Sequence, residues 1–247
     1  MKEMDSYGLK LCKFQAELFE RSINAAECSS AIFIRRFMLS DLAKRFDAVS
    51  VREKSAIRLC KQYLGVDAVH LIDPTLLLIK EDYIDLLHPT AKTENLLVCY
   101  ILDKTDQKTA IATEIMRSLG YQIQNINIDG NNSRQLSVEE WIDSFHRADF
   151  IFTDSFHGCV FSVIFRKPFI VFGNIDRGLS RFDSLLNMFD LKNRMVTSYD
   201  DYKNRCHELL MSFNYNQVDS IIACEQKKSL EFLTKYLTEF YKTNNNA

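Results

Sequence analysis

The stretch that most constrains the fold covers residues 149–173 and reads DFIFTDSFHGCVFSVIFRKPFIVFG. Residues 150–152 and 168–172 are apolar runs too short for helices, which is typical of buried strands in a parallel sheet. Between them lies an apolar segment long enough for a helix, and Asp154 or Ser155 offers the side-chain oxygen that a helix N-cap needs. A strand, a polar turn, a helix and a second strand in succession predict a parallel α/β unit.

His157 and Gly158 fall in the first turn of that expected helix, where backbone N–H groups lack helical partners and the helix dipole is positive. Ligands of parallel sheets bind beyond the carboxyl ends of the strands, so this turn is the expected place for an anion. Gly158 would let a ligand or a neighbouring backbone approach closely. Ordinary helix capping gives the same pattern, and a single histidine is more often structural than catalytic, so the residues alone leave both interpretations open.

Strands and helices alternate along the rest of the chain. Apolar runs predict further strands at residues 46–51, 66–72, 96–102 and 121–128. Helical spacing predicts helices at residues 53–64, 83–87, 107–119, 137–145, 182–189 and 217–242. Gly65 and Gly120 mark the ends of two of them. The alternation predicts an α/β protein with a doubly wound, Rossmann-like parallel sheet.

Two helices show a marked apolar face. The first begins with a capping box from Ser137 to Glu140, and its apolar face consists of Val138, Trp141, Ile142 and Phe145. The terminal helix carries a second row, which consists of Leu230, Leu233, Leu237 and Phe240.

Composition argues against several classes of protein. A formal net charge of −2 leaves no basic excess to neutralise a nucleic acid backbone. The 7 cysteines form no CxxC pair and no zinc-spaced cluster, so neither a metal nor a tightly held cofactor is implied. The sequence has no signal peptide and no apolar run near the roughly 18 residues of a membrane span. We therefore expect a cytoplasmic protein without a transmembrane segment.

Three motifs in the chain resemble the polysaccharide pyruvyl transferase family. The central one is TDSFHG at residues 153–158, followed by an apolar helix and the strand start PFI. The other two are DAVSVREKS at residues 47–55 and NIDRG at residues 174–178, which leads into SRF. The resemblance spans roughly residues 42 to 195, and three motifs in the right order are far more specific than any one alone.

This resemblance implies a fold like that of the GT-B glycosyltransferases and a transferase activity. Characterised members move a pyruvyl group from phosphoenolpyruvate onto a sugar as a ketal, which suggests a role in bacterial capsule, exopolysaccharide or related surface-glycan synthesis. The implied partners are phosphoenolpyruvate and a sugar or glycan precursor, with no cofactor. His157 matches the family histidine that is taken as the general acid for the methylene carbon of the enol.

The resemblance also implies roles for polar residues around this histidine. Arg177 and Arg181 would hold the phosphate and carboxylate of the donor, although two arginines here also fit a solvated helix start. Asn174 would orient a sugar hydroxyl, and Gly158 would lie against substrate. Ser155 is a further candidate for contact with substrate. Better understood members carry an arginine at its position, so either Arg177 or Arg181 supplies that charge or the donor differs.

Arg52 follows a predicted strand and is a further candidate for the acidic groups of the donor. An ion pair with Glu53 or Asp47 is its alternative role. We expect Arg52, His157, Arg177 and Arg181 to point into one crevice, because all four follow strand ends on one side of a parallel arrangement.

The order of the predicted units suggests an incomplete first domain. Residues 1–90 are interpreted as a remnant of an amino-terminal Rossmann-like domain with a hinge, residues 91–215 as a carboxyl-terminal Rossmann-like domain, and residues 216–247 as a terminal helix. The edge of a strand that lacks its neighbouring strands must be covered by another part of the chain, or it will pair with a second chain. We therefore expect weak donor binding, little pyruvyl transfer, and self-association through the amino-terminal part.

Two alternatives remain open at this stage. One is a non-catalytic remnant that binds a sugar phosphate or a partner chain. The other is a GT-B glycosyltransferase that uses a nucleotide sugar, whose pyrophosphate would face the positive helix end.

Overall fold

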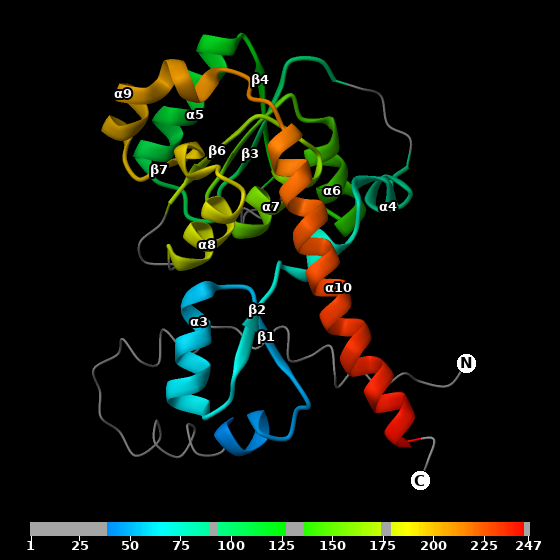
Figure 1. Cartoon of the computed structure of the whole chain (residues 1–247). Coiled ribbons are helices and arrows are strands. Elements are labelled where there is room, and N and C mark those ends of the chain that lie inside the picture. Colours follow the sequence, from blue (N-terminus) through cyan, green and yellow to red (C-terminus); the bar gives the residue numbers. More distant parts are fainter. Residues whose placement is uncertain (1–38, 89–92, 127–135, 174–178, 245–247) are drawn as a thin grey trace. The chain divides into compact units, whose positions relative to one another are not determined.

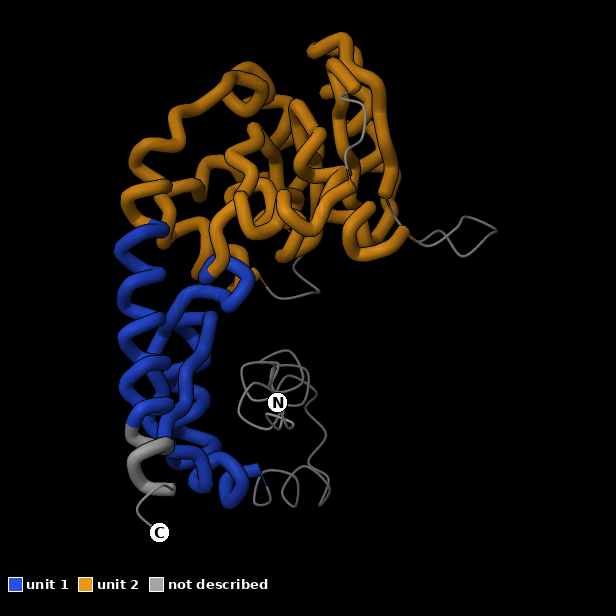
Figure 2. Tube along the Cα trace, turned by 90° about the vertical axis from the view of Figure 1, so that its right-hand side faces the viewer, with its two compact units in different colours: residues 1–77, 222–247 blue, residues 78–221 orange. Residues whose placement is uncertain are grey.

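A computed structural model of the chain describes residues 39–88, 93–126, 136–173 and 179–244. The chain divides into two compact units (Figure 2). The first unit contains the residues up to Leu77 and those from Ile222 onward, and the second contains Leu78–Ile221. The long helix α10, Asn216–Asn244, starts in the second unit and continues into the first.

The second unit is built on a parallel sheet of five strands in the order β4-β3-β5-β6-β7 (Figure 1). Its strands are β3 (Leu96–Tyr100), β4 (Gln122–Asn125), β5 (Phe150–Thr153), β6 (Phe169–Phe172) and β7 (Met195–Val196). All residues of β5 and β6 are buried, as expected for strands that helices cover on both faces. The α/β, doubly wound fold predicted from the sequence is confirmed.

The winding of this sheet reverses between β3 and β5. The chain passes from β3 outward to β4 and returns to pair β5 with the other edge of β3. The paired residues Tyr100 and Thr153 lie at the carboxyl ends of the two strands. Such a switch point is where doubly wound sheets bind ligands, so the loops that follow β3 and β5 are the expected frame of a site.

Helices cover both faces of the sheet (Figure 1). On one face, α5 (Asp106–Leu119) and α9 (Tyr199–Leu210) pack together, and Ile111 and Tyr202 reach the core beneath them. Right-handed crossovers place the helices that precede and follow β5 on the opposite face. These are α6 (Val138–Arg147) and α7 (Phe156–Ile164), which pack against each other. The unit also includes α4 (Lys80–Ile84), α8 (Ser180–Met188) and the 3₁₀ turn η4 (Lys192–Arg194).

The described part of the first unit is small. Its strands β1 (Val49–Val51) and β2 (Ala68–His70) form a parallel pair joined by α3 (Lys54–Leu59) and the π-helical η1 (Cys60–Leu64). The 3₁₀ turn η2 (Pro74–Leu77) follows β2. Its core gathers a few apolar side chains, among them Ala43, Cys60, Leu64, Val49 and Val51.

Several elements are shorter than the sequence suggests or shifted along the chain, because local hydrogen bonds fix their ends at other residues. The amide of Phe46 bonds to the carbonyl of Ala43, which holds it in a turn before β1. The amide of Val66 bonds to the carbonyl of Cys60, which makes it part of the helix end rather than of β2. In α4, the Asp82 carboxylate accepts from the amide of Ile79, so this helix occupies Lys80–Ile84 rather than residues 83–87.

Other differences concern exposure and short elements. Val138 is 69% exposed, so the apolar face of α6 begins only with Trp141. Leu230 and Leu237 are exposed on α10. Neither β7 nor α9 was predicted, because two strand residues and a helix rich in charges give weak sequence signals. The expected end of β4 at residue 128 lies outside the described residues.

Candidate functional site

The motif that links β5 to α7 forms a tight, buried turn. Ser155 is the N-cap of α7, and its hydroxyl oxygen accepts a hydrogen bond from the amide of Gly158 at 3.4 Å. Ser155 therefore takes the capping role for which the sequence offered two candidates, while Asp154 turns inward. The positive end of the α7 dipole lies at this turn.

Thr153 holds the turn from beneath. Its hydroxyl donates to the carbonyl of Tyr100 at 2.7 Å and accepts from the amide of Ser155 at 3.0 Å. A Cβ atom on Gly158 would lie 2.3 Å from the Thr153 hydroxyl oxygen. Position 158 therefore needs a glycine because the Thr153 side chain lies against it, and not only to let a ligand or a backbone approach. For Ser155 and Gly158, which are both buried, substrate contact stays a prediction.

Asp154, the other cap candidate, instead anchors the turn to the loop after β3 and to α5. Its carboxylate accepts hydrogen bonds from the amides of Leu102 and Asp103 and from the Lys108 ammonium group, at 2.6, 3.1 and 2.7 Å. The side chains of Lys108 and Asp154 are only 3% and 0% exposed. One feature of the sequence hints at this role. Lys108 lies near the start of α5, where the positive end of the helix dipole favours acidic residues, so a lysine there suggests a buried acidic partner.

His157 alone among residues 153–158 is exposed. Its ring stands edge-on to Phe156, with the ring centres 5.4 Å apart. The guanidinium carbon of Arg181, on α8, lies 5.9 Å from the centre of the same Phe156 ring. The fold thus brings two of the predicted site residues, His157 and Arg181, close to the same buried aromatic ring.

An aromatic cluster supports α7 behind His157. Phe161, one turn further along the helix, stacks edge-on against Trp141 and Tyr83, with ring centres 5.0 Å apart in both pairs. Trp141 also meets Tyr100 at the end of β3, at 5.3 Å. These contacts join α4, α6 and β3 to α7 and restrict its movement.

Arg52 lies in the first unit, just after β1. Its guanidinium bonds to the carboxylate of Asp73 at 2.7 Å, a partner that the sequence did not suggest. Burial alone would raise the pKa of Asp73, but hydrogen bonds from Thr75 and Arg52 outweigh it and lower the pKa. The pair joins the segments after β1 and β2, and contact of Arg52 with the donor stays a prediction.

The remaining predicted residues are not placed together by the described structure. Asn174 and Arg177 lie outside the described residues. Arg52 and His157 belong to different units. A crevice shared by Arg52, His157, Arg177 and Arg181 stays a prediction.

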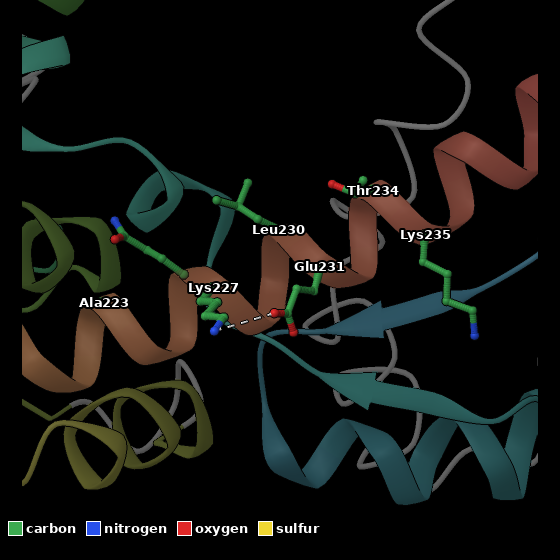
Figure 3. Close-up of a pocket in the computed structure, with 7 residues that line it drawn as sticks. Ala223, Lys227, Leu230, Glu231, Thr234 and Lys235 are labelled. Atoms are coloured by element: carbon green, nitrogen blue, oxygen red, sulfur yellow. Dashed lines mark ion pairs between the residues drawn. The ribbon is translucent and has the colours of Figure 1, made fainter.

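The first unit also has an open hollow beside α10 (Figure 3). Lys227 and Glu231 form an ion pair of 4.0 Å at its edge. The described residues that line it are Ala223, Gln226, Lys227, Leu230, Glu231, Thr234 and Lys235. None of the described candidate site residues, which are Arg52, Ser155, His157, Gly158 and Arg181, lines this hollow.

The comparisons with known proteins agree with the motifs. A model of the family described as polysaccharide pyruvyl transferase matches residues 33–177, which is more than half of the chain. No curated protein and no solved structure matches. Within the described ranges, no helix is both long and apolar enough to cross a membrane.

Proposed function

The chain belongs to the polysaccharide pyruvyl transferase family, and on that premise we propose that it transfers pyruvyl from phosphoenolpyruvate to a sugar, in the cytoplasm, during surface polysaccharide synthesis. The observation that carries the proposal is the turn after β5. Its polar residues are fixed inside the fold, and His157 is exposed at the positive end of α7. This is the placement that an acid acting on an anionic substrate requires.

The reaction assigns one proton-transfer role to His157. Protonated His157 gives its proton to the methylene carbon of phosphoenolpyruvate, which turns that carbon into a methyl group and leaves the neighbouring carbon electrophilic. One sugar hydroxyl adds to that carbon, and a second displaces inorganic phosphate to close the ketal. One of the two hydroxyl protons returns to His157 and the other leaves with the phosphate, so the enzyme ends in its starting state.

Arg181 is the described residue best placed to hold the donor. A guanidinium group presents paired N–H donors to a carboxylate or phosphate. The Phe156 ring, which lies near both Arg181 and His157, would help to set the distance between the anion and the proton. Arg52, Arg177 and Asn174 stay in the proposal as further contacts to the donor and the sugar.

Ser155 favours a second candidate. A neutral, buried cap cannot replace the arginine that better understood members carry at this position. The alternative is a protein that keeps the fold and binds a nucleotide sugar, a sugar phosphate or a partner chain without pyruvyl transfer.

Calorimetric titration of the whole chain with phosphoenolpyruvate and with nucleotide sugars separates these candidates. We expect heat from phosphoenolpyruvate, and an affinity at least about tenfold lower in Arg181→Met, because a charge-assisted contact is lost. Arg166→Met is the matched control, since Arg166 is exposed just past the other end of α7, where it pairs with Asp219. Binding of a nucleotide sugar but not of phosphoenolpyruvate would refute the proposed donor.

A further inference from the structure

The carboxyl ends of β3 and β5 are joined by a buried ion pair. Lys108, in the first turns of α5, donates from its ammonium group to Asp154 at 2.7 Å and to the carbonyl of Asp103 at 2.7 Å. The same ammonium group lies 5.1 Å from the centre of the Phe172 ring. Asp154, directly after β5, also accepts the amides of Leu102 and Asp103. One carboxylate therefore bonds both to the loop that follows β3 and to the helix α5 that this loop leads into.

We propose that the Lys108–Asp154 pair is a clamp that positions His157 for catalysis, an assignment that rests on the proposed function. The clamp fixes the residue three places before His157 to the neighbouring strand end. The backbone takes part, because the amide of Asp154 bonds to the carbonyl of Tyr100 at 3.3 Å. The side chains of Lys108 and Asp154 are both buried and bond to groups within the fold, so we assign both as positioning residues.

Stability alone does not account for a pair of this kind. Burying two charges costs solvation energy, and well-packed apolar replacements for such pairs are often neutral or stabilising. What an apolar pair cannot do is accept two backbone amides and donate to a carbonyl at the same time. The clamp therefore specifies the geometry of the two loops at the switch point of the sheet, where a site must be held within a fraction of an ångström.

The test uses amide hydrogen exchange on the whole chain, read at the amides of Ser155, Gly158 and Cys159. Lys108→Met removes the ammonium group but leaves Asp154 its two backbone donors. We expect exchange at these three amides to accelerate by about 10²-fold, although Lys108 contacts none of the three, because a buried charge loses its partner. Asp154→Asn should have an equal or larger effect. Lys108→Met decides the matter if Asp154→Asn does not fold.

Two further variants separate positioning from stability. In Lys108→Met/Asp154→Leu we expect the melting temperature to recover while the exchange at Ser155 and Gly158 stays fast. Asp67→Asn is the matched control, because it breaks an exposed Lys61–Asp67 pair of the same 2.7 Å length and should leave these amides unchanged.

Turnover adds a readout that depends on the proposed function. For Lys108→Met we expect kcat to fall about 10²-fold with a much smaller change in KM, since the donor contacts remain and the proton donor is displaced. If the wild-type chain does not turn over phosphoenolpyruvate, the proposed function fails, but the exchange measurement still decides the clamp. Unchanged exchange at Ser155, Gly158 and Cys159 in both single variants would overturn it.

Discussion

His157 owes its position to its neighbours in the chain more than to its own contacts. Thr153, Asp154 and Ser155 each direct their side chains into the fold, toward β3, the β3–α5 loop and the first turn of α7. This leaves the histidine exposed at a rigid point. A proton donor held in this way needs little rearrangement before it reacts.

Replacing His157 by glutamine tests its role as the acid. His157→Gln keeps a polar side chain of similar length but has no proton to exchange near neutral pH. We expect turnover to fall by about 10²-fold or more, while the melting temperature stays nearly the same because the side chain is exposed. Full activity, or loss of the folded state, would return His157 to a structural role.

Gly158 should tolerate no side chain. In Gly158→Ala the new Cβ meets the Thr153 hydroxyl oxygen at 2.3 Å, so α7 or β5 must shift. We expect a loss of about 1–3 kcal/mol in the free energy of unfolding. Gly120→Ala is a useful contrast, because its surroundings are open and only its positive φ of 69° makes alanine costly, at about 1 kcal/mol. Denaturant titration of both variants measures the difference, and a neutral Gly158→Ala would contradict the packing described.

At the scale of elements, the sequence predicts the strands and helix caps well. Apolar runs place β3, β5 and β6. The capping box at Ser137 and the cap candidates after β5 place two helix starts, because these signals are local. The Lys108–Asp154 pair escapes such a reading. Its members lie 46 positions apart and meet only because β3 and β5 are neighbours in the sheet.

The candidate site shows the same limit. His157 and the turn that carries it can be found from the motif, whereas the groups from elsewhere in the chain that bond to this turn lie at the end of β3, in the loop after it and in α5. The contact of Arg181 with Phe156 joins two helices, and the pairing of Arg52 with Asp73 joins two strand ends. Pairings across the fold depend on topology, which a single sequence specifies only through its whole pattern.

The cap of α7 gives a prediction at this scale. Ser155→Ala removes the acceptor for the Gly158 amide, and we expect it to cost about 1 kcal/mol of unfolding free energy, close to the cost of Ser137→Ala at the start of α6. If Ser155 only caps the helix, the affinity for phosphoenolpyruvate measured by calorimetry should be equal in both variants. A selective loss of affinity in Ser155→Ala would place the serine in the binding site instead.

For the whole molecule, the two units divide the predicted site residues. His157 and Arg181 lie in the second unit, on a sheet whose fold is that of a doubly wound domain. Arg52 lies in the first unit and is held by Asp73. If Arg52 contributes to donor binding, that contribution therefore requires a folded first unit.

The stability of the first unit should depend on pH through Asp73. Its pKa is lowered in the folded state, so the folded chain binds fewer protons there than the unfolded chain. The stabilisation is complete above about pH 4, the unfolded value, and is lost as the pH falls through the lowered folded pKa. The test measures melting temperatures by circular dichroism between about pH 2 and pH 7. The melting temperature should fall more steeply with decreasing pH in the wild type than in Asp73→Asn. Asp67→Asn, at an exposed pair, should keep the wild-type slope.

Product analysis tests the central claim most directly. The whole chain is incubated with phosphoenolpyruvate and a mixture of sugar and glycan precursors, and inorganic phosphate is followed together with the masses of the acceptors. We predict that phosphate and one pyruvyl ketal appear in equal amounts, however slowly, and that both disappear in His157→Gln. Phosphate without a ketal, transfer from a nucleotide sugar, or equal product from the wild type and His157→Gln would contradict the account.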